Sequence, residues 1–155
     1  MKTTDSVAER DLTPKLLSTA AWGATLMRFS LAAYWSVHWW FKVGFRGMPL
    51  TEKFFAHQGL PAWLAWFDIS FELVVTACLL LGLYVPLVCL VSLPILFASM
   101  IIYSANGFYF TSGGIELPIL WALVQVALAL LGPGVMRITP PKWLPRVPIF
   151  PALGP

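Results

Sequence analysis

The chain has 155 residues, of which 59% are hydrophobic and only 11% are charged, and its mean hydropathy is +0.78. Soluble domains average about 45–50% apolar and about 25% charged residues, so this composition excludes an ordinary soluble domain and indicates an integral membrane protein. The net charge of +3 comes from scattered basic residues, and no polar stretch is long enough for a nucleic-acid-binding fold. We therefore expect no nucleic-acid partner and take the lipid bilayer as the main one.

Four apolar runs follow one another along the chain, each close to the roughly 20 residues that a membrane-spanning helix needs. We expect these helices at about 19–41, 63–84, 87–103 and 115–131. Pro94 lies inside the third run and predicts a kink there. Glycines and prolines flank residues 51–58, which predicts a short interfacial helix that directs Phe54 and Phe55 into the headgroup region.

The predicted fold class is therefore all-α, an integral membrane four-helix bundle with a short interfacial helix in the first loop. Residues 1–18 form a polar N-terminal segment, and residues 19–134 form the four-helix membrane domain. Residues 135–155 form a C-terminal tail rich in proline, a residue that disfavours helix, so we expect this tail to be extended.

Basic residues near the ends of the spans predict the orientation. Four spans place both termini on one side, and that side collects Lys2, Arg10, Lys15, Arg137, Lys142 and Arg146. The opposite side holds only Lys42, Arg46 and Lys53, all in the first loop or at its start. Because lysine and arginine are enriched in cytoplasmic loops, we expect a multi-pass protein of the cell (plasma) membrane with both termini in the cytoplasm.

Ionisable residues interrupt the apolar runs. They are Arg28 and His38 in the first run, Asp68 and Glu72 in the second, and Glu116 at the start of the fourth. A charge at the centre of a membrane helix costs about 2.5–3.5 kcal/mol on insertion scales, so such residues face the protein interior, find partners and mark functional sites.

Helical spacing predicts how these residues meet. Asp68 and Glu72 are four residues apart and share one face of the second helix. On the first helix one sector holds Arg28, Trp35, His38 and Lys42. Antiparallel packing brings Arg28 to about the depth of Glu72, so we expect these two to form an ion pair. Such a pair has a second interpretation, in which it only fixes the register of the two helices.

Near the outer face, the same register predicts one pocket shared by His38, Lys42, Asp68 and Glu116. Burial favours the neutral form of a carboxyl group, and histidine titrates near neutral pH. We therefore take His38, Asp68 and Glu116 as the candidate catalytic residues, in the sense of groups that exchange protons.

No intrinsic cofactor or metal site is expected. Cys78 and Cys89 lie in separate apolar runs without CxxC spacing. His57, the only histidine besides His38, lies in a loop, which disfavours paired haem ligation. Tryptophans are typical of the membrane interface, but aromatic walls beside a histidine and carboxylates would also suit a flat quinone ring. The tryptophans concerned are Trp35, Trp39, Trp40, Trp63 and Trp66.

An ordered set of single residues and short motifs extends along the four apolar runs and their loops. Its members are Arg28, Lys42, Gly59-Leu60-Pro61, Glu72, Leu79-Leu80-Leu81-Gly82-Leu83, Asn106-Gly107-Phe108, Gly113-Gly114-Ile115-Glu116-Leu117-Pro118 and Leu131-Gly132-Pro133-Gly134. Together they resemble the DoxX family of small four-helix membrane proteins. The family usually carries a basic residue after the Gly-Leu that closes the second helix, where this chain has Tyr84, Val85 and Pro86. The proline-rich tail is also outside the common pattern.

The resemblance implies a link to membrane redox systems, because named relatives include a subunit of a terminal quinol oxidase, also described as thiosulfate:quinone oxidoreductase, and a complex that handles oxidative stress. On this basis we expect an accessory subunit of a redox complex, with a quinone as ligand and a redox subunit or a second copy of the chain as partner. The resemblance does not decide whether the chain is itself an enzyme. The ligand-binding candidates are Arg28, Trp35, Lys42, Glu72 and Asn106.

Two alternatives from other functional classes stay open at this point. One is a small proton-coupled transporter or permeation pathway for a weak-acid metabolite, lined by the same carboxylates and Arg28. The other is a membrane assembly factor that binds no small ligand.

Overall fold

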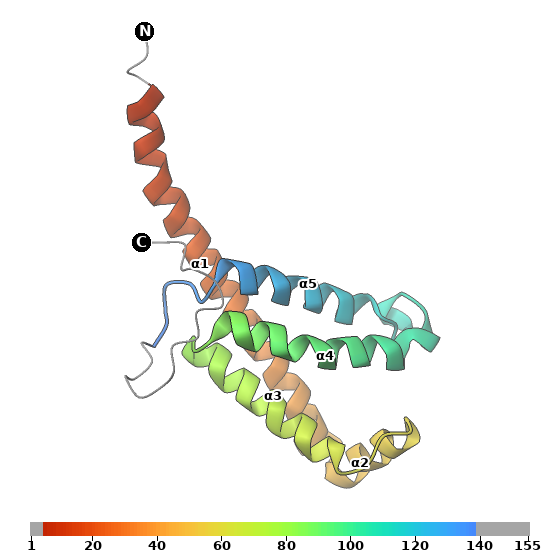
Figure 1. Cartoon of the computed structure of the whole chain (residues 1–155). Helices are drawn as coiled ribbons and strands as arrows, with labels where there is room; N and C mark the ends of the chain where they lie inside the picture. The colour runs from red at the N-terminus through yellow and green to blue at the C-terminus, as the bar shows by residue number, and fades with distance from the viewer. Residues whose placement is uncertain (1–4, 139–155) are drawn as a thin grey trace.

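The structure, a computed structural model, describes the backbone of residues 5–138 and the side chains from residue 19 onward. Within this part the chain is helical, and the all-α prediction is confirmed. The elements, shown in Figure 1, are α1 (Asp5–Trp40), the π-helical turn η1 (Phe41–Phe45), α2 (Met48–His57), α3 (Leu64–Leu81), α4 (Val85–Tyr103), the short 3-10 turns η2 (Ser104–Asn106) and η3 (Phe110–Ser112), and α5 (Glu116–Leu131). Most of the predicted C-terminal tail lies outside the described residues.

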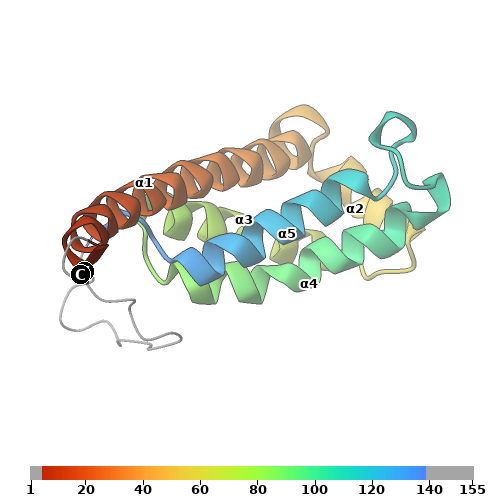
Figure 2. The same ribbon diagram turned by 90° about the horizontal axis from the view of Figure 1, so that it is seen from above.

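The helix order agrees with the sequence, but several boundaries differ. Helix α1 begins at Asp5 rather than near residue 19, and Figures 1 and 2 show it extending beyond the other helices. The apolar run predicts how much of a helix lies in lipid, whereas residues 5–18 also contain the good helix formers alanine, leucine, glutamate and lysine, and α1 includes them despite Pro14. Helix α2 begins at Met48, three residues before the predicted start at Thr51.

Helix α3 ends at Leu81, earlier than the predicted end near residue 84, and Gly82 is its C-cap. Gly82 adopts a left-handed conformation with φ of 71°, which glycine reaches without steric cost. The amide of Leu83 donates to the Cys78 carbonyl at 2.9 Å, and the amide of Gly82 donates to the Leu79 carbonyl at 3.3 Å. These two bonds form a Schellman motif, so the chain reverses within three residues and α4 starts at Val85.

The four long helices form two pairs. Helix α1 packs most extensively on α3, and α4 packs most extensively on α5; smaller contacts of α1 with α5 and of α3 with α4 join the pairs. In Figure 1 the pairs lie close together near the turn between α3 and α4, and they separate toward the end that carries α2. Figure 2 shows that α2 and the loop between α4 and α5 lie at this same end.

The interior between the pairs is mostly apolar, but hydrogen bonds of one buried glutamine join α4 and α5. The buried cluster consists of Ala24, Leu31, Ala32, Trp35, Val75, Leu79, Val85, Val88, Cys89, Leu96, Ala122, Leu128 and Ala129. Gln125 is fully buried; its amide donates to the Cys89 carbonyl at 2.8 Å and also to the Ser92 hydroxyl. Such hydrogen bonds across helices are typical of membrane bundles, where water cannot supply a partner.

The outer faces of the same helices are apolar as well. Large hydrophobic side chains that are half or more exposed include Leu26, Val74, Ile101, Leu120 and Leu123. Among the described helices, α3 and the segment Val85–Asn106 have the length and composition of membrane spans, and α5 is apolar but shorter. Apolar residues on both the inside and the outside of a helix are typical of a protein that lipid surrounds.

Candidate functional site

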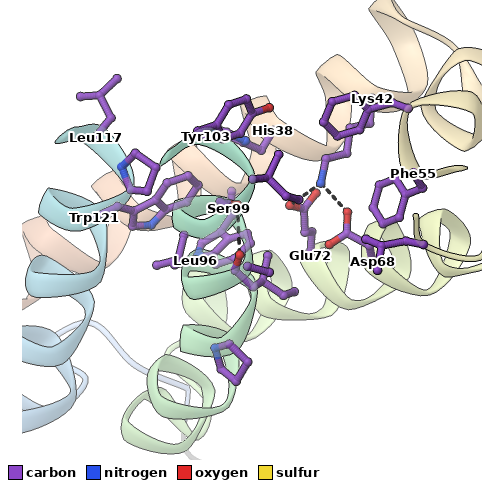
Figure 3. A pocket seen from close by; sticks show the side chains of 18 of the residues that line it. His38, Lys42, Phe55, Asp68, Glu72, Leu96, Ser99, Tyr103, Leu117 and Trp121 are labelled. Atoms are coloured by element: carbon purple, nitrogen blue, oxygen red, sulfur yellow. Dashed lines mark hydrogen bonds and ion pairs between the residues drawn. The ribbon is translucent and has the colours of Figure 1, made fainter. Parts of the chain in front are cut away.

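A cavity of about 490 Å³ lies where the two helix pairs separate (Figure 3). This volume falls in the range of about 300–1,000 Å³ that is usual for small-molecule sites. Residues from α1, η1, α2, α3, α4, α5 and the loop before α5 line it. Its aromatic side chains are Trp35, Phe54, Phe55, Phe67, Tyr103, Phe110 and Trp121. The walls are therefore suited to a flat or apolar ligand.

The polar end of the cavity is an ion-paired triad of Lys42, Asp68 and Glu72. The Nζ atom of Lys42 lies 2.9 Å from Oε1 of Glu72 and also contacts Oδ2 of Asp68, as Figure 3 shows. The side chain of Lys42 is 20% exposed, that of Asp68 11% and that of Glu72 2%. The sequence predicted that both carboxylates share one face of α3, and the structure brings Lys42 between them.

The π-helical turn η1 positions Lys42 at the end of α1. A π-helical turn is wider than an α-helical one and occurs frequently at functional sites. The buried hydroxyl of Thr51, on α2, lies 3.0 Å from the Lys42 carbonyl oxygen and 3.1 Å from that of Gly47, and donates to these acceptors. Helix α2 thus holds the backbone of Lys42 against the start of α3.

The triad contains one unsatisfied acceptor. Oε2 of Glu72 is buried and has no hydrogen-bond partner among the described residues. A buried polar atom without a partner costs about 1–3 kcal/mol, and more if it is charged. This cost makes the triad sensitive to any group that brings a proton or a hydrogen-bond donor.

His38 lies on the α1 side of the cavity, beside two tryptophans. Its ring centroid is 4.7 Å from that of Trp121, and Trp121 is 4.8 Å from Trp35. His38, Lys42 and Asp68 thus line one cavity, in the grouping that the sequence predicted.

The expected ion pair between Arg28 and Glu72 is wrong. Arg28 is fully buried, and Nη1 donates to the Leu80 carbonyl at 2.9 Å and also to the Leu79 carbonyl, while Nη2 donates to the Met136 carbonyl. The last carbonyls of a helix lack intrahelical partners, and a cation at the C-terminal end also interacts favourably with the helix dipole. Arg28 therefore reaches the end of α3 and does not contribute to the cavity.

The segment after α5 completes this arrangement at the end opposite the cavity. The amide of Val135 donates to the Thr25 hydroxyl at 2.9 Å, and the amide of Ile138 donates to the Leu81 carbonyl at 3.0 Å. Gly134 approaches α1 so closely that a Cβ atom there would lie 2.2 Å from the Thr25 hydroxyl oxygen. Arg28 and this segment together join α1, the C-terminal end of α3 and the chain after α5. We call this the closed end of the bundle.

Glu116 and Asn106 lie behind the cavity wall rather than in the cavity. Oε2 of Glu116 accepts a hydrogen bond from the Phe110 amide at 3.0 Å, and Asn106 donates from Nδ2 to the Gly113 carbonyl at 3.1 Å. Neither residue lines the cavity, so the expected place of Glu116 in the pocket is wrong. Both instead hold the loop between α4 and α5, whose Phe110, Gly113 and Gly114 form part of the wall. Residue spacing could not predict this role, because it does not show how the loop between α4 and α5 folds.

Several lining residues were not among the sequence candidates. Phe54 and Phe55 were expected to face the headgroups, but both line the cavity, because α2 packs against α3 and η1. Trp121 was also missed; it lies one helical turn before Gln125 on the inner face of α5, and this spacing was the available signal.

The described residues contain no group of three or more histidine, cysteine or acidic side chains that could hold a metal ion. Cys78 and Cys89 are free thiols, and Cys89 is part of the buried apolar cluster. The site that the geometry defines is thus an aromatic cavity with an ion-paired end, in a helical protein with apolar outer faces.

The DoxX family model matches residues 23–105, which is more than half of the chain, and the protein belongs to the DoxX family. The match includes Arg28 and the whole Lys42, Asp68 and Glu72 triad, and it ends before α5. Neither a curated protein nor a solved structure matches the chain. Family membership and the two span-length apolar helices identify a DoxX-like membrane protein.

Proposed function

We propose that this DoxX-like protein is an accessory subunit of a membrane redox complex and that its cavity binds a quinone-type ligand. The observation that carries the proposal is the position of Lys42 at the polar end of an aromatic cavity. An ammonium group has three N–H donors, and two of them are directed to Asp68 and Glu72. The third is available for a carbonyl oxygen, which is the polar group of a quinone.

The other lining residues fit the same ligand. The rings of Trp121 and Phe55 offer apolar faces for a flat ring, and the His38 imidazole provides a second polar contact on the α1 side. A bound quinone would supply two-electron, two-proton redox chemistry. His38 and Asp68 would hold and exchange protons at the cavity, since both are ionisable and both line it. Glu116 has no part in this proposal.

We assign the electron transfer to a partner subunit. The lysine, histidine and acidic side chains that line the cavity are suited to binding and proton exchange, and they are not themselves oxidised or reduced in such a reaction. A second copy of the chain is the other partner to be tested, by cross-linking in membranes.

The proposal includes the topology. All four long helices cross the cell membrane, both termini lie in the cytoplasm, and α2 lies at the outer interface. The span length of α3 and α4 supports this arrangement, as does the packing of α1 and α5 alongside them. Reporter fusions at the two termini test it, because a signal from the outer side of the membrane at either terminus would contradict it.

Binding of a short-chain ubiquinone to the purified protein in lipid nanodiscs tests the ligand. The probe should quench tryptophan fluorescence with saturation, because Trp35 and Trp121 line the cavity. Lys42→Met should weaken this binding by about tenfold or more, since it removes the donor to the carbonyl oxygen. Lys53→Met, which removes an exposed lysine of α2 that does not line the cavity, is the matched control.

Equal binding by wild type and Lys42→Met would contradict the proposed site. Proton-coupled uptake of a weak acid into proteoliposomes, without quinone binding, would favour the transporter instead. Capture of a redox subunit by a protein that binds neither ligand would favour an assembly factor.

A further inference from the structure

The polar end of the cavity carries more negative than positive charge. With both carboxyl groups ionised, Lys42 supplies one positive charge, Asp68 and Glu72 supply two negative charges, and the sum is −1 while His38 is neutral. These four are the lysine, the acidic residues and the histidine that line the cavity. The triad therefore has an uncompensated charge within a mostly apolar site.

Among the described residues, Arg28, Arg46 and Arg137 form no ion pair with the triad, and Arg137 lies beside Gly82 at the closed end of the bundle. Arg28 donates to carbonyls at the end of α3, and Leu79 and Leu80 lie about 11 Å along the helix from Glu72. Arg46 lies outside the cavity, over the rings of Phe41 and Phe54 at 5.3 and 5.1 Å. Within the described part of the chain, Lys42 is thus the cation that pairs with the two carboxylates.

The triad has acceptors for such a group. Oε2 of Glu72 has no hydrogen-bond partner among the described residues, and the residue is 98% buried, since its exposed fraction is 2%. Asp68 contacts Lys42 through Oδ2, so Oδ1 can accept from a ligand on the more exposed side of the triad. When the two carboxyl groups are ionised, these oxygens can accept hydrogen bonds but cannot donate them, which selects for a ligand that donates.

The cavity walls suit a cation as well. Figure 3 shows Phe55 beside the triad and Tyr103 and Trp121 farther along the cavity, and Trp35, Phe54, Phe67 and Phe110 complete the aromatic lining. The face of an aromatic ring attracts an ammonium group, by about 0.5–2 kcal/mol depending on its exposure. The charge of the triad, its free carboxylate oxygens and the aromatic walls therefore all favour a positively charged ligand.

We propose that the cavity binds an amphiphilic organic cation, a protonated amine with an apolar body. Its ammonium group donates to Asp68 and Glu72 beside Lys42, and its apolar body lies along the aromatic walls. This inference goes beyond the proposed quinone site and does not rest on it, because a quinone is neutral and interacts with Lys42 rather than with the carboxylates.

The test compares three probes of nearly one shape: phenylbutylamine, phenylbutanol and phenylbutyrate. Affinities are measured by calorimetry at neutral pH, on the full chain in nanodiscs of neutral phosphatidylcholine, so that the lipid does not select by charge. We expect the amine to bind about tenfold tighter than the alcohol, and the acid to bind most weakly. Equal affinity for amine and alcohol in the unmodified protein would overturn the proposal. It would mean that a proton on one of the two carboxylates, rather than a bound ammonium group, neutralises the triad.

Two variants locate the effect, each with its fold checked by circular dichroism. Asp68→Asn should weaken amine binding about tenfold and leave alcohol binding unchanged. Glu116→Gln removes the same charge at the same end of the bundle but outside the cavity, and should leave both affinities unchanged. An equal loss in the two variants would contradict the assignment to the triad.

Lys42→Met separates this inference from the quinone proposal. The variant removes the lysine ammonium, so the ammonium of phenylbutylamine can take its place between the carboxylates. Amine binding should be at least as tight as in the wild type, whereas quinone binding should be weakened. Loss of amine binding in a folded Lys42→Met protein would overturn the inference and leave the quinone site intact.

Discussion

Lys42 and Glu72, which are 30 residues apart in the chain, are joined by an ion pair with an Nζ–Oε1 distance of 2.9 Å. This pair fixes the end of α1 against the middle of α3, beside the cavity. At the other end of the same helix pair, Arg28 binds backbone carbonyls of α3. Arg28 of α1 and Lys42 of η1 thus hold α3 at two positions along its length. Lys42 binds carboxylates, and Arg28 binds backbone carbonyls.

Arg28→Met should lower the free energy of unfolding by about 3 kcal/mol or more, because it leaves buried carbonyls of α3 and of the segment after α5 without donors. Thermal unfolding in detergent would measure this loss. Arg46→Met, which removes a partly exposed arginine over two aromatic rings, is the control and should cost less. A fully stable Arg28→Met protein would contradict the role of Arg28 in closing the bundle end.

Gly134→Ala should destabilise the protein by more than 1 kcal/mol, on the order expected where a side chain meets both strain and a clash. The backbone has φ of 77°, and the new Cβ would lie 2.2 Å from the Thr25 hydroxyl oxygen. Gly132→Ala is a matched control, because its φ is 83° but no atom lies within 4 Å of the added Cβ. Denaturant unfolding of both variants separates the clash at Gly134 from the backbone strain that both positions share. Equal losses in the free energy of unfolding would show that the contact of Gly134 with α1 is unimportant.

Glu116→Ala should loosen the loop between α4 and α5 without unfolding the bundle. The substitution removes the acceptor of the Phe110 amide, so hydrogen exchange at that amide should become faster while amides of α3 keep their protection. Glu52→Ala, which removes an acidic residue bonded to the Trp66 indole, is the control for a general effect of losing a carboxylate. Unchanged exchange at Phe110 would contradict this role.

Gln125→Leu should weaken the packing of α4 on α5. It removes bonds to the Cys89 carbonyl and the Ser92 hydroxyl, and such interhelical bonds are worth about 0.6–2 kcal/mol each. Thermal unfolding should report a loss of this order. Ser99→Ala, which removes only a bond within α4, should have a smaller effect.

The fold class and part of the site follow from local patterns. Apolar runs and the glycines and prolines between them predict the order of the helices, because both signals act within a few residues. The spacing of Asp68 and Glu72 predicts their shared face for the same reason. Lys42 was predicted to lie near Asp68, though not near Glu72, because antiparallel packing fixes the depth of residues near the helix ends.

The sequence could not predict partners that are backbone atoms. Arg28 was paired with Glu72 because a carboxylate is visible in a sequence, whereas the free carbonyls at the end of α3 are not. Glu116 was placed in the pocket from its depth in the membrane alone. Its carboxylate instead accepts a hydrogen bond from the nearby Phe110 amide, at the start of α5. The start of α1 was misjudged because hydropathy measures contact with lipid and not the extent of the helix.

The separation of the two helix pairs has a mechanical consequence. Arg28 and the segment after α5 close one end, and the 18-residue helix α3 extends about 27 Å from it. A rotation of about 5° about the closed end would widen the far end by about 2 Å. We therefore expect substitutions at the closed end to change which thickness of ligand the aromatic walls accept.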